Sequence, residues 1–164
     1  MVIGLVDFLI DQSLHLSNLI SARSTVESIN KNELTLPDSN SEFVTIDQVD
    51  LKKVIVGDIE IAYKTFGRGE PILLISGSGN VMDVWPPYFL KVLAKCHKVT
   101  IFDNPGVGNT TEGTKSFSVK QFANDTLGLM NVLGIEKADV LGFSMGSFVA
   151  QQLVIMYPEK SIEI

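Results

Sequence analysis

The chain has 164 residues, a length that fits a single domain, and 45% of them are hydrophobic, which suffices for a packed core and excludes a disordered composition. The formal net charge of −6 argues against nucleic acid as a partner, because binding to phosphates requires clustered Lys and Arg. The single cysteine, Cys96, excludes an internal disulfide framework and a cysteine-rich zinc site. We expect Cys96 to be buried or half-buried and the compartment to be cytoplasmic, and we expect neither a metal nor a cofactor.

The first 42 residues differ in character from the rest of the chain. Over residues 1–21, apolar side chains recur near helical spacing and predict an amphipathic helix. The apolar run at its start is too short to cross a bilayer. A secretory signal requires a basic segment before its apolar run, whereas the first Lys or Arg of this sequence is Arg23. We therefore favour packing or a partner contact over a membrane surface. Residues 22–42 are expected to form a polar linker, and the folded domain should span residues 43–164.

From residue 49 onward the sequence alternates between strand and helix patterns. Two β-rich stretches around Gly57-Asp58 predict an antiparallel hairpin, and three short continuous apolar runs predict strands buried on both faces. The expected strands cover residues 49–56, 59–66, 71–75, 97–102 and 138–143. The expected helices cover residues 86–94, residues 118–134 with Ser118 as the cap, and residues 146–157.

Strands that alternate with helices predict an α/β fold, in which a parallel sheet is covered on both faces. Three glycine-rich junctions, at residues 76–79, 103–108 and 142–146, each follow a predicted buried strand. Binding sites in such sheets form at the carboxyl ends of the strands, so we expect the three junctions to meet at one edge of the sheet.

The junction Gly142-Phe-Ser-Met-Gly146 matches the pattern G-x-S-x-G between a predicted strand and a predicted helix. A serine at such a sharp turn is lifted clear of the backbone, and the turn requires small residues on both sides, here Gly142 and Gly146. The N-terminus of the following helix offers unpaired N–H groups that favour a developing oxyanion. Ser144 is therefore the candidate nucleophile, and the alternative is an ordinary tight turn in which Ser144 caps the helix.

Several motifs, in the same order, resemble the α/β-hydrolase superfamily from about residue 49 to the end of the sequence. Residues 76–79 stand where the family has its oxyanion turn, which Gly77 would shape. Residues 103–110 resemble the family's Asp-x-Arg-Gly-x-Gly-x-Ser stretch, and residues 139–146 resemble its nucleophile elbow. The resemblance implies an α/β-hydrolase-type sheet, and hydrolysis of an ester, amide or similar bond of a small-molecule substrate through an acyl-enzyme.

The roles of individual residues carry over from this resemblance. It implies that Ser144 is the nucleophile and that the backbone N–H groups of Ser78 and Met145 bind the oxyanion. Two residues depart from the family pattern: Ser76 replaces a histidine with a mainly structural role, and Pro105 replaces an arginine. We expect the second change to remove any polar anchoring that the arginine would give between loops and to destabilise this region, because proline lacks both a charge and an N–H.

A serine hydroxyl requires a general base, normally a histidine oriented by an acid. The sequence contains His15 in the N-terminal extension and His97, which should begin its strand at the sheet edge opposite the nucleophile. Asp103 is expected to stabilise its own turn, whereas Asp125 and Asp139 are expected to be solvated. The sequence therefore provides no candidate for the catalytic histidine or for the acid.

The family fold, as the resemblance implies, contains more strands than the five expected here. We therefore expect a sheet that is truncated after the nucleophile-bearing helix, with the catalytic histidine and acid supplied by residues outside this sequence. The last strand would then present an open, hydrophobic edge, which invites association with another chain.

Two other functions are compatible with the same pattern. A domain of this fold without a base could act as a non-catalytic module that binds a small molecule or a protein. Nucleotide binding at Gly77-x-Gly79 has less support, because Met82 stands in place of the third glycine of G-x-G-x-x-G and no P-loop lysine follows.

Overall fold

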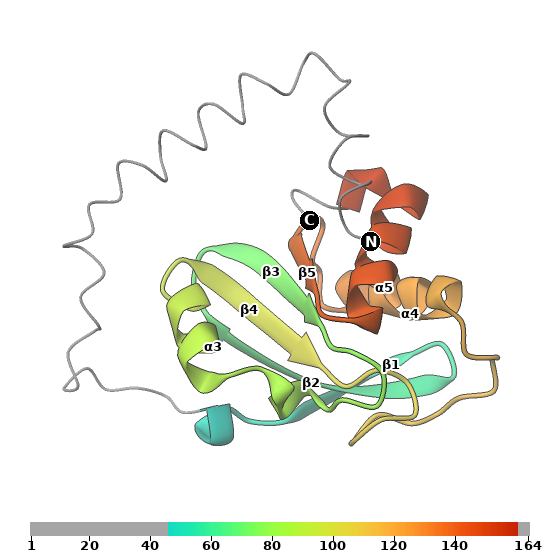
Figure 1. Ribbon diagram of the computed structural model, residues 1–164, viewed down its shortest axis with the longest axis horizontal. Coiled ribbons are helices and arrows are strands. Elements are labelled where there is room, and N and C mark those ends of the chain that lie inside the picture. The colour runs from blue at the N-terminus through green and yellow to red at the C-terminus, as the bar shows by residue number, and fades with distance from the viewer. Residues whose placement is uncertain (1–45, 161–164) are drawn as a thin grey trace, which may run out of the picture. The chain divides into compact units, whose positions relative to one another are not determined.

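Five strands form one mixed sheet in the computed structural model, which describes residues 46–160 (Figure 1). The helix predicted over residues 1–21 and the linker predicted over residues 22–42 lie outside the described residues. The strands are β1 (Lys52–Val56), β2 (Ile59–Gly67), β3 (Glu70–Ile75), β4 (His97–Phe102) and β5 (Asp139–Gly142). They lie in the order β1-β2-β4-β3-β5, and all five were expected from the sequence with small differences at their ends.

The directions of the strands determine at which edge of the sheet the three glycine-rich junctions lie. β1 and β2 form an antiparallel hairpin that turns at Gly57, whose φ of 62° is open to glycine without steric cost. β2 is also antiparallel to β4, whereas β3 is parallel to both β4 and β5. The hairpin followed by parallel strands confirms the predicted α/β class. Because β3, β4 and β5 run in one direction, their carboxyl ends at Ile75, Phe102 and Gly142 share one edge.

The helices follow the strands in the predicted alternation. They are α3 (Pro87–Leu93), α4 (Val119–Val132) and α5 (Met145–Met156), with short 3-10 helices at Ile46–Gln48, Met82–Val84 and Pro158–Lys160. Ser118 caps α4 as predicted, because its side chain accepts a hydrogen bond from the N–H of Gln121 at 3.0 Å. Within residues 46–160, no helix is long and apolar enough to cross a membrane.

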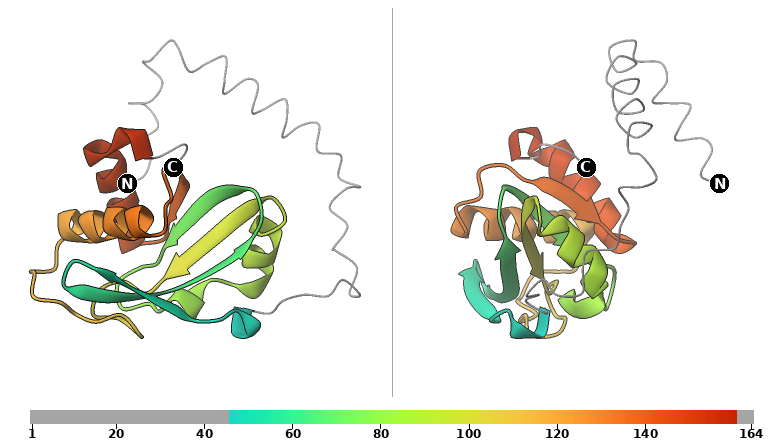
Figure 2. Two further views of the ribbon diagram at one scale, coloured as in Figure 1. Left: turned by 180° about the vertical axis from the view of Figure 1, so that it is seen from behind. Right: turned by 90° about the vertical axis from the view of Figure 1, so that its left-hand side faces the viewer.

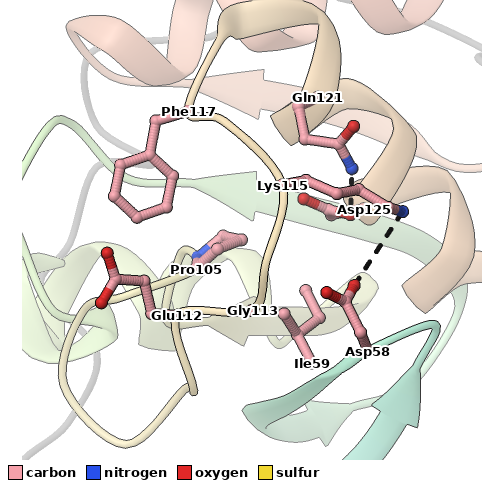
Figure 3. Close-up of a pocket in the computed structure, with 9 residues that line it drawn as sticks. All are labelled: Asp58, Ile59, Pro105, Glu112, Gly113, Lys115, Phe117, Gln121 and Asp125. Atoms are coloured by element: carbon pink, nitrogen blue, oxygen red, sulfur yellow. Dashed lines mark hydrogen bonds and ion pairs between the residues drawn. The ribbon is translucent and has the colours of Figure 1, made fainter.

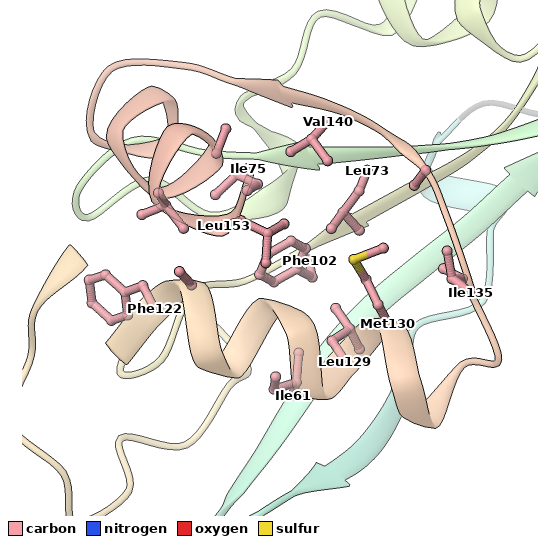
Figure 4. Packing of buried hydrophobic residues seen from close by; sticks show 14 of the residues in the cluster. Ile61, Leu73, Ile75, Phe102, Phe122, Leu129, Met130, Ile135, Val140 and Leu153 are labelled. Atoms are coloured by element: carbon pink, nitrogen blue, oxygen red, sulfur yellow. The ribbon is translucent and has the colours of Figure 1, made fainter. Parts of the chain in front are cut away.

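Helices cover both faces of the sheet, as Figure 2 shows from two sides. On one face, Leu73 and Ile75 of β3 pack with Leu153 and other buried residues of α4 and α5 (Figure 4). On the opposite face, Leu74 packs in a second cluster that includes Leu90 of α3. Successive residues of β3 therefore enter different layers, which explains why a strand buried on both faces reads as a continuous apolar run.

β5 ends the sheet, and among the described residues its outer edge has no partner strand. The following helix, α5, contains no Asp, Glu, Lys or Arg in its 12 residues. Two of its large apolar side chains are largely exposed, Phe148 at 61% and Ile155 at 75%. An uncharged helix beside an open strand edge is a surface on which further polypeptide can bury apolar area.

Candidate active site

Ser144 occupies the sharp turn between β5 and α5. Its φ of 55° and ψ of −121° make it the one non-glycine residue with positive φ in residues 46–160. Such a conformation is costly for a residue with a Cβ, and it persists only where the surrounding structure imposes it. The side chain is exposed and makes no capping hydrogen bond, so the alternative interpretation of Ser144 as a simple helix cap is wrong.

Close backbone contacts hold this turn in place. A Cβ on Gly146 would collide with the carbonyl oxygen of Ile75 at the end of β3, and a Cβ on Gly142 would collide with the carbonyl oxygen of Gly146. The N–H of Phe143 donates to Ile75 O at 3.0 Å, which fixes the turn to the neighbouring strand. Glycine is therefore required at both positions because the start of α5 lies directly against the strand ends.

The turn after β3 lies against Ser144 although some seventy residues separate them in the sequence. A Cβ on Gly77 would lie 3.1 Å from the Cβ of Ser144 and 3.5 Å from Cδ1 of Phe143. Ser76 is fully buried beneath this turn, and its Oγ donates to the carbonyl oxygen of Asn80 at 3.0 Å. The structure thus brings the predicted oxyanion turn and the predicted elbow into direct contact.

Two backbone N–H groups at this contact have no acceptor among residues 46–160. One belongs to Met145, the first residue of α5, and the other to Ser78, the neighbour of Gly77. The N-terminus of a helix carries a partial positive charge, which adds to the attraction of these groups for an anionic oxygen. The site can therefore offer at least two hydrogen-bond donors beside an exposed hydroxyl.

The loop after β4 is organised by a buried carboxylate and a buried carboxamide. Asp103, 1% exposed, accepts hydrogen bonds from the N–H of Met82 at 2.6 Å and of Asn109 at 2.8 Å, in the stabilising role expected for it. Asn104 donates from Nδ2 to the carbonyl oxygen of Ser76 at 3.1 Å and to its Oγ at 3.3 Å. Asp103 and Asn104 therefore anchor these loops, and the destabilising effect expected of Pro105 stays a prediction.

Sequence reasoning missed Asn104, although a carboxamide directly after a buried strand and next to a turn-forming Asp is a detectable signal.

Three aromatic side chains lie together beside the elbow, and one of them, Phe143, belongs to the elbow itself. The ring of Trp85 meets that of Phe143 edge to face at 6.4 Å between centroids and stacks on Phe89 at 5.9 Å. Because Phe143 is 51% exposed and precedes Ser144, it provides an apolar wall next to the hydroxyl.

His97, the single histidine within residues 46–160, lies at the far edge of the sheet from Ser144. It begins β4, opposite Glu70 at the start of β3, whereas Ser144 follows the carboxyl end of β5. Its Nε2 lies 3.7 Å from Oδ2 of Asp139, which begins β5. The expectation that His97 is remote from the nucleophile is confirmed, and in the described residues no imidazole is available to Ser144.

Three predictions about side-chain environment are wrong. Cys96 is exposed in the turn before β4, and Asp139 is half-buried beside His97 instead of solvated. Asp125 is 9% exposed on α4, where burial raises its pKa above the ordinary value of 3.8, against the opposing effect of a 2.8 Å hydrogen bond from Nε2 of Gln121. Solvation depends on which elements pack together, which the local sequence pattern does not reveal.

Asp125 lines a pocket between the β1–β2 turn, the loop over residues 105–117 and the start of α4 (Figure 3). Asp58 also lines it, and hydrogen bonds from the hydroxyl of Thr114 at 2.6 Å and its N–H at 2.7 Å lower the pKa of that carboxyl. None of the predicted site residues lines this pocket. It is therefore separate from the group around Ser144.

Comparison with known proteins gives one family for this chain. A family model described as "alpha/beta hydrolase fold" matches residues 70–161. The chain is 37% identical over 102 residues to "Putative non-heme bromoperoxidase BpoC" of Mycobacterium tuberculosis, which covers 62% of this chain and 38% of that protein. It is 30% identical over 127 residues to 2-hydroxy-6-oxo-6-phenylhexa-2,4-dienoate hydrolase of Comamonas testosteroni, with 74% and 42% of the two chains covered.

Among solved structures, an alpha/beta hydrolase fold protein from Chitinophaga pinensis superposes with a TM-score of 0.65 at 30% identity. The match covers 69% of this chain and 42% of that chain. In each of these three comparisons, the chain spans less than half the length of the protein that it matches.

Proposed function

Because the chain belongs to the α/β-hydrolase fold family, we propose that it carries the nucleophile and the oxyanion-binding groups of a serine hydrolase site. The reaction would be the hydrolysis of an ester, amide or similar bond through an acyl-Ser144 intermediate. One observation supports this proposal above the others: Ser144 is exposed in a strained backbone conformation, directly beside two unpaired N–H groups.

The chemistry follows from this arrangement. The Oγ of Ser144 bonds to the carbonyl carbon, and the π electron pair of the carbonyl moves onto its oxygen. The N–H groups of Ser78 and Met145 would bind this oxyanion, each lowering the barrier by about 3 kcal/mol. When the carbonyl re-forms, the bond to the leaving group breaks and the leaving group departs with its electron pair and takes up a proton. Water then hydrolyses the acyl-Ser144 ester.

The hydroxyl proton must pass to a base within hydrogen-bond reach. His97 does not meet this requirement, since it lies at the other edge of the sheet. We propose that an imidazole from polypeptide outside residues 46–160 completes the site. The activity is therefore assigned to the assembled protein, of which residues 46–160 supply the nucleophile and the oxyanion donors.

The substrate is proposed to be a small molecule with an apolar part. Phe143 and Trp85 form the wall beside Ser144, and further apolar side chains of the same region, Val81 and Val84, are about two-fifths exposed. Apolar surface next to a nucleophile favours a substrate that can bury alkyl or aromatic groups there. The Comamonas relative, named for a substrate with a phenyl group, is consistent with this class.

A serine-directed fluorophosphonate probe tests the proposal. The full-length gene product should be labelled at Ser144, and Ser144→Ala should abolish the labelling. Ser116→Ala provides a matched control, because Ser116 is exposed in the loop before α4 and far from the elbow in sequence. Labelling that persists in Ser144→Ala, or that never occurs in the natural protein, would contradict the assignment.

A non-catalytic binding module on the same fold is the second candidate. It is favoured by one observation, namely that Ser144 has no imidazole neighbour in the described residues. This alternative predicts that ligand or partner binding survives Ser144→Ala unchanged and that no ester is turned over. Measuring both quantities on the same preparation separates the two candidates.

A further inference from the structure

The turn after β3 presents an asparagine from a fixed backbone. The N–H of Asn80 donates to the carbonyl oxygen of Gly77 at 3.2 Å, and its own carbonyl oxygen accepts from Ser76 Oγ at 3.0 Å. Ser76 is in turn held by the carboxamide of Asn104. Both backbone polar groups of Asn80 are thus bonded, so the side chain projects from a turn with little conformational freedom.

Gly77 separates this side chain from the proposed nucleophile. The position that a Cβ on Gly77 would occupy lies 3.1 Å from Nδ2 of Asn80 and equally 3.1 Å from Cβ of Ser144. The Nδ2 of Asn80 and the Cβ of Ser144 are therefore no further apart than twice this distance, and Cδ1 of Phe143 lies 3.5 Å from the same position. A group bound to the hydroxyl of Ser144 on this side would also be near the amide of Asn80.

Asn80 is half-buried, and its carboxamide has no hydrogen-bond partner among residues 46–160. Asn104 makes a useful contrast, since its Nδ2 forms two hydrogen bonds that join the loops. A partly desolvated amide without a partner gains more from a ligand than one that is already bonded or fully hydrated. Asn80 therefore has a donor to offer at the surface of the site.

Building on the function proposed above, we propose that the Nδ2 of Asn80 is a third hydrogen-bond donor to the oxygen that becomes negative when Ser144 attacks. The N–H groups of Ser78 and Met145 would be the other two donors. A neutral amide forms a stronger hydrogen bond to an oxyanion than it forms to a ground-state carbonyl oxygen. The amide therefore stabilises the transition state more than the bound substrate. A carboxylate at this position would repel the same charge.

Kinetics of the full-length gene product with p-nitrophenyl acetate test the catalytic part. Asn80→Ala is expected to lower kcat by about 10²-fold with little change in KM, and Asn80→Asp to lower it at least as much. Asn109→Ala is the matched control, because Asn109 is an exposed asparagine of the neighbouring loop whose backbone bond to Asp103 survives the change. Equal losses in Asn80→Ala and Asn109→Ala would overturn the proposal.

A binding measurement decides the role of Asn80 even if the chain turns over no ester. Amide NMR spectra of the isotope-labelled chain are recorded during titration with methyl methylphosphonate, an unreactive tetrahedral anion. The side-chain NH₂ signal of Asn80, identified by its loss in Asn80→Ala, should shift along one binding curve with the N–H signals of Ser78 and Met145. An unmoved Asn80 signal, with or without movement of the backbone signals, would overturn the inference.

The two failures are distinguishable. Loss of the proposed function appears as absent labelling of Ser144, whereas loss of the inference appears as an Asn80 signal that does not respond to the anion. The titration should give the same result in Ser144→Ala, since the donors and not the hydroxyl hold the anion.

Discussion

Replacing Ser144 by glycine and by alanine isolates the strain at the elbow. Ser144 has a φ of 55° and a ψ of −121°, and its side chain makes no capping hydrogen bond. Both substitutions remove the hydroxyl, but only glycine removes the Cβ that makes this conformation costly. The difference in unfolding free energy between the two variants therefore reports the backbone strain, reduced by the greater conformational freedom that glycine loses on folding.

The magnitude follows from two opposing effects. A residue held in such a sparsely populated region costs about 1 to 3 kcal/mol, which glycine relieves. Glycine also loses more conformational freedom on folding than alanine, at a cost of about 0.5 to 1 kcal/mol. The difference between these two ranges runs from about 0 to about 2.5 kcal/mol, and we expect Ser144→Gly to be more stable than Ser144→Ala by about 1 kcal/mol.

Urea unfolding followed by circular dichroism provides the measurement, with equal m-values required of the two variants. Gln151, exposed in the regular part of α5, supplies the control pair. There glycine should be the less stable variant by about 1 kcal/mol, the opposite sign, because no positive φ is relieved. If glycine is less stable than alanine at position 144 by as much as at position 151, the elbow is not strained and the reasoning fails.

Two further predictions concern the surface and the pocket. Burial raises the pKa of Asp125, so the carboxyl group of Asp125 binds its proton more tightly in the folded chain than in the unfolded chain. The free energy of unfolding therefore falls as the pH rises through the folded pKa and this carboxyl group ionises. Asp125→Asn should therefore raise Tm at pH 7 and lose this advantage as the pH falls below about 4. A gain in Tm that is the same at pH 7 and below about pH 4 would refute the explanation. At the open edge, we propose that another chain associates through β5 and α5, which in a preparation of this chain alone would be a second copy. Phe148→Lys combined with Ile155→Lys should then shift size-exclusion profiles toward the monomer, whereas an unchanged profile would exclude this face.

The elements of this fold were predictable from the sequence because their signals are local. The run Pro71–Ile75 and the spacing of apolar residues in α4 depend on neighbours a few positions away, as does the cap at Ser118. The elbow was predictable for the same reason. Its glycines and its serine lie within five residues, between a predicted strand and a predicted helix, so the pattern could be recognised without knowing that β3 also holds the turn.

The environment of many side chains was not predictable, because it depends on pairing between distant segments. The order β1-β2-β4-β3-β5 places β3 between β4 and β5, and the first residues of β4 and β5, His97 and Asp139, come close together. Asp125 was interpreted as solvated because it is charged, although it lies three residues after Phe122 and four before Leu129, on the buried face of α4.

The sequence by itself determined the class of the fold and the residue that stands at the elbow, since both follow from short-range backbone preferences. Only the tertiary structure decided what surrounds that residue. The common edge of the two turns and the remote place of His97 were expected from the strand pattern. The position of Asn80 beside Gly77 and the hydrogen bonds from Asn104 to Ser76 were not, because they join loops that follow different strands.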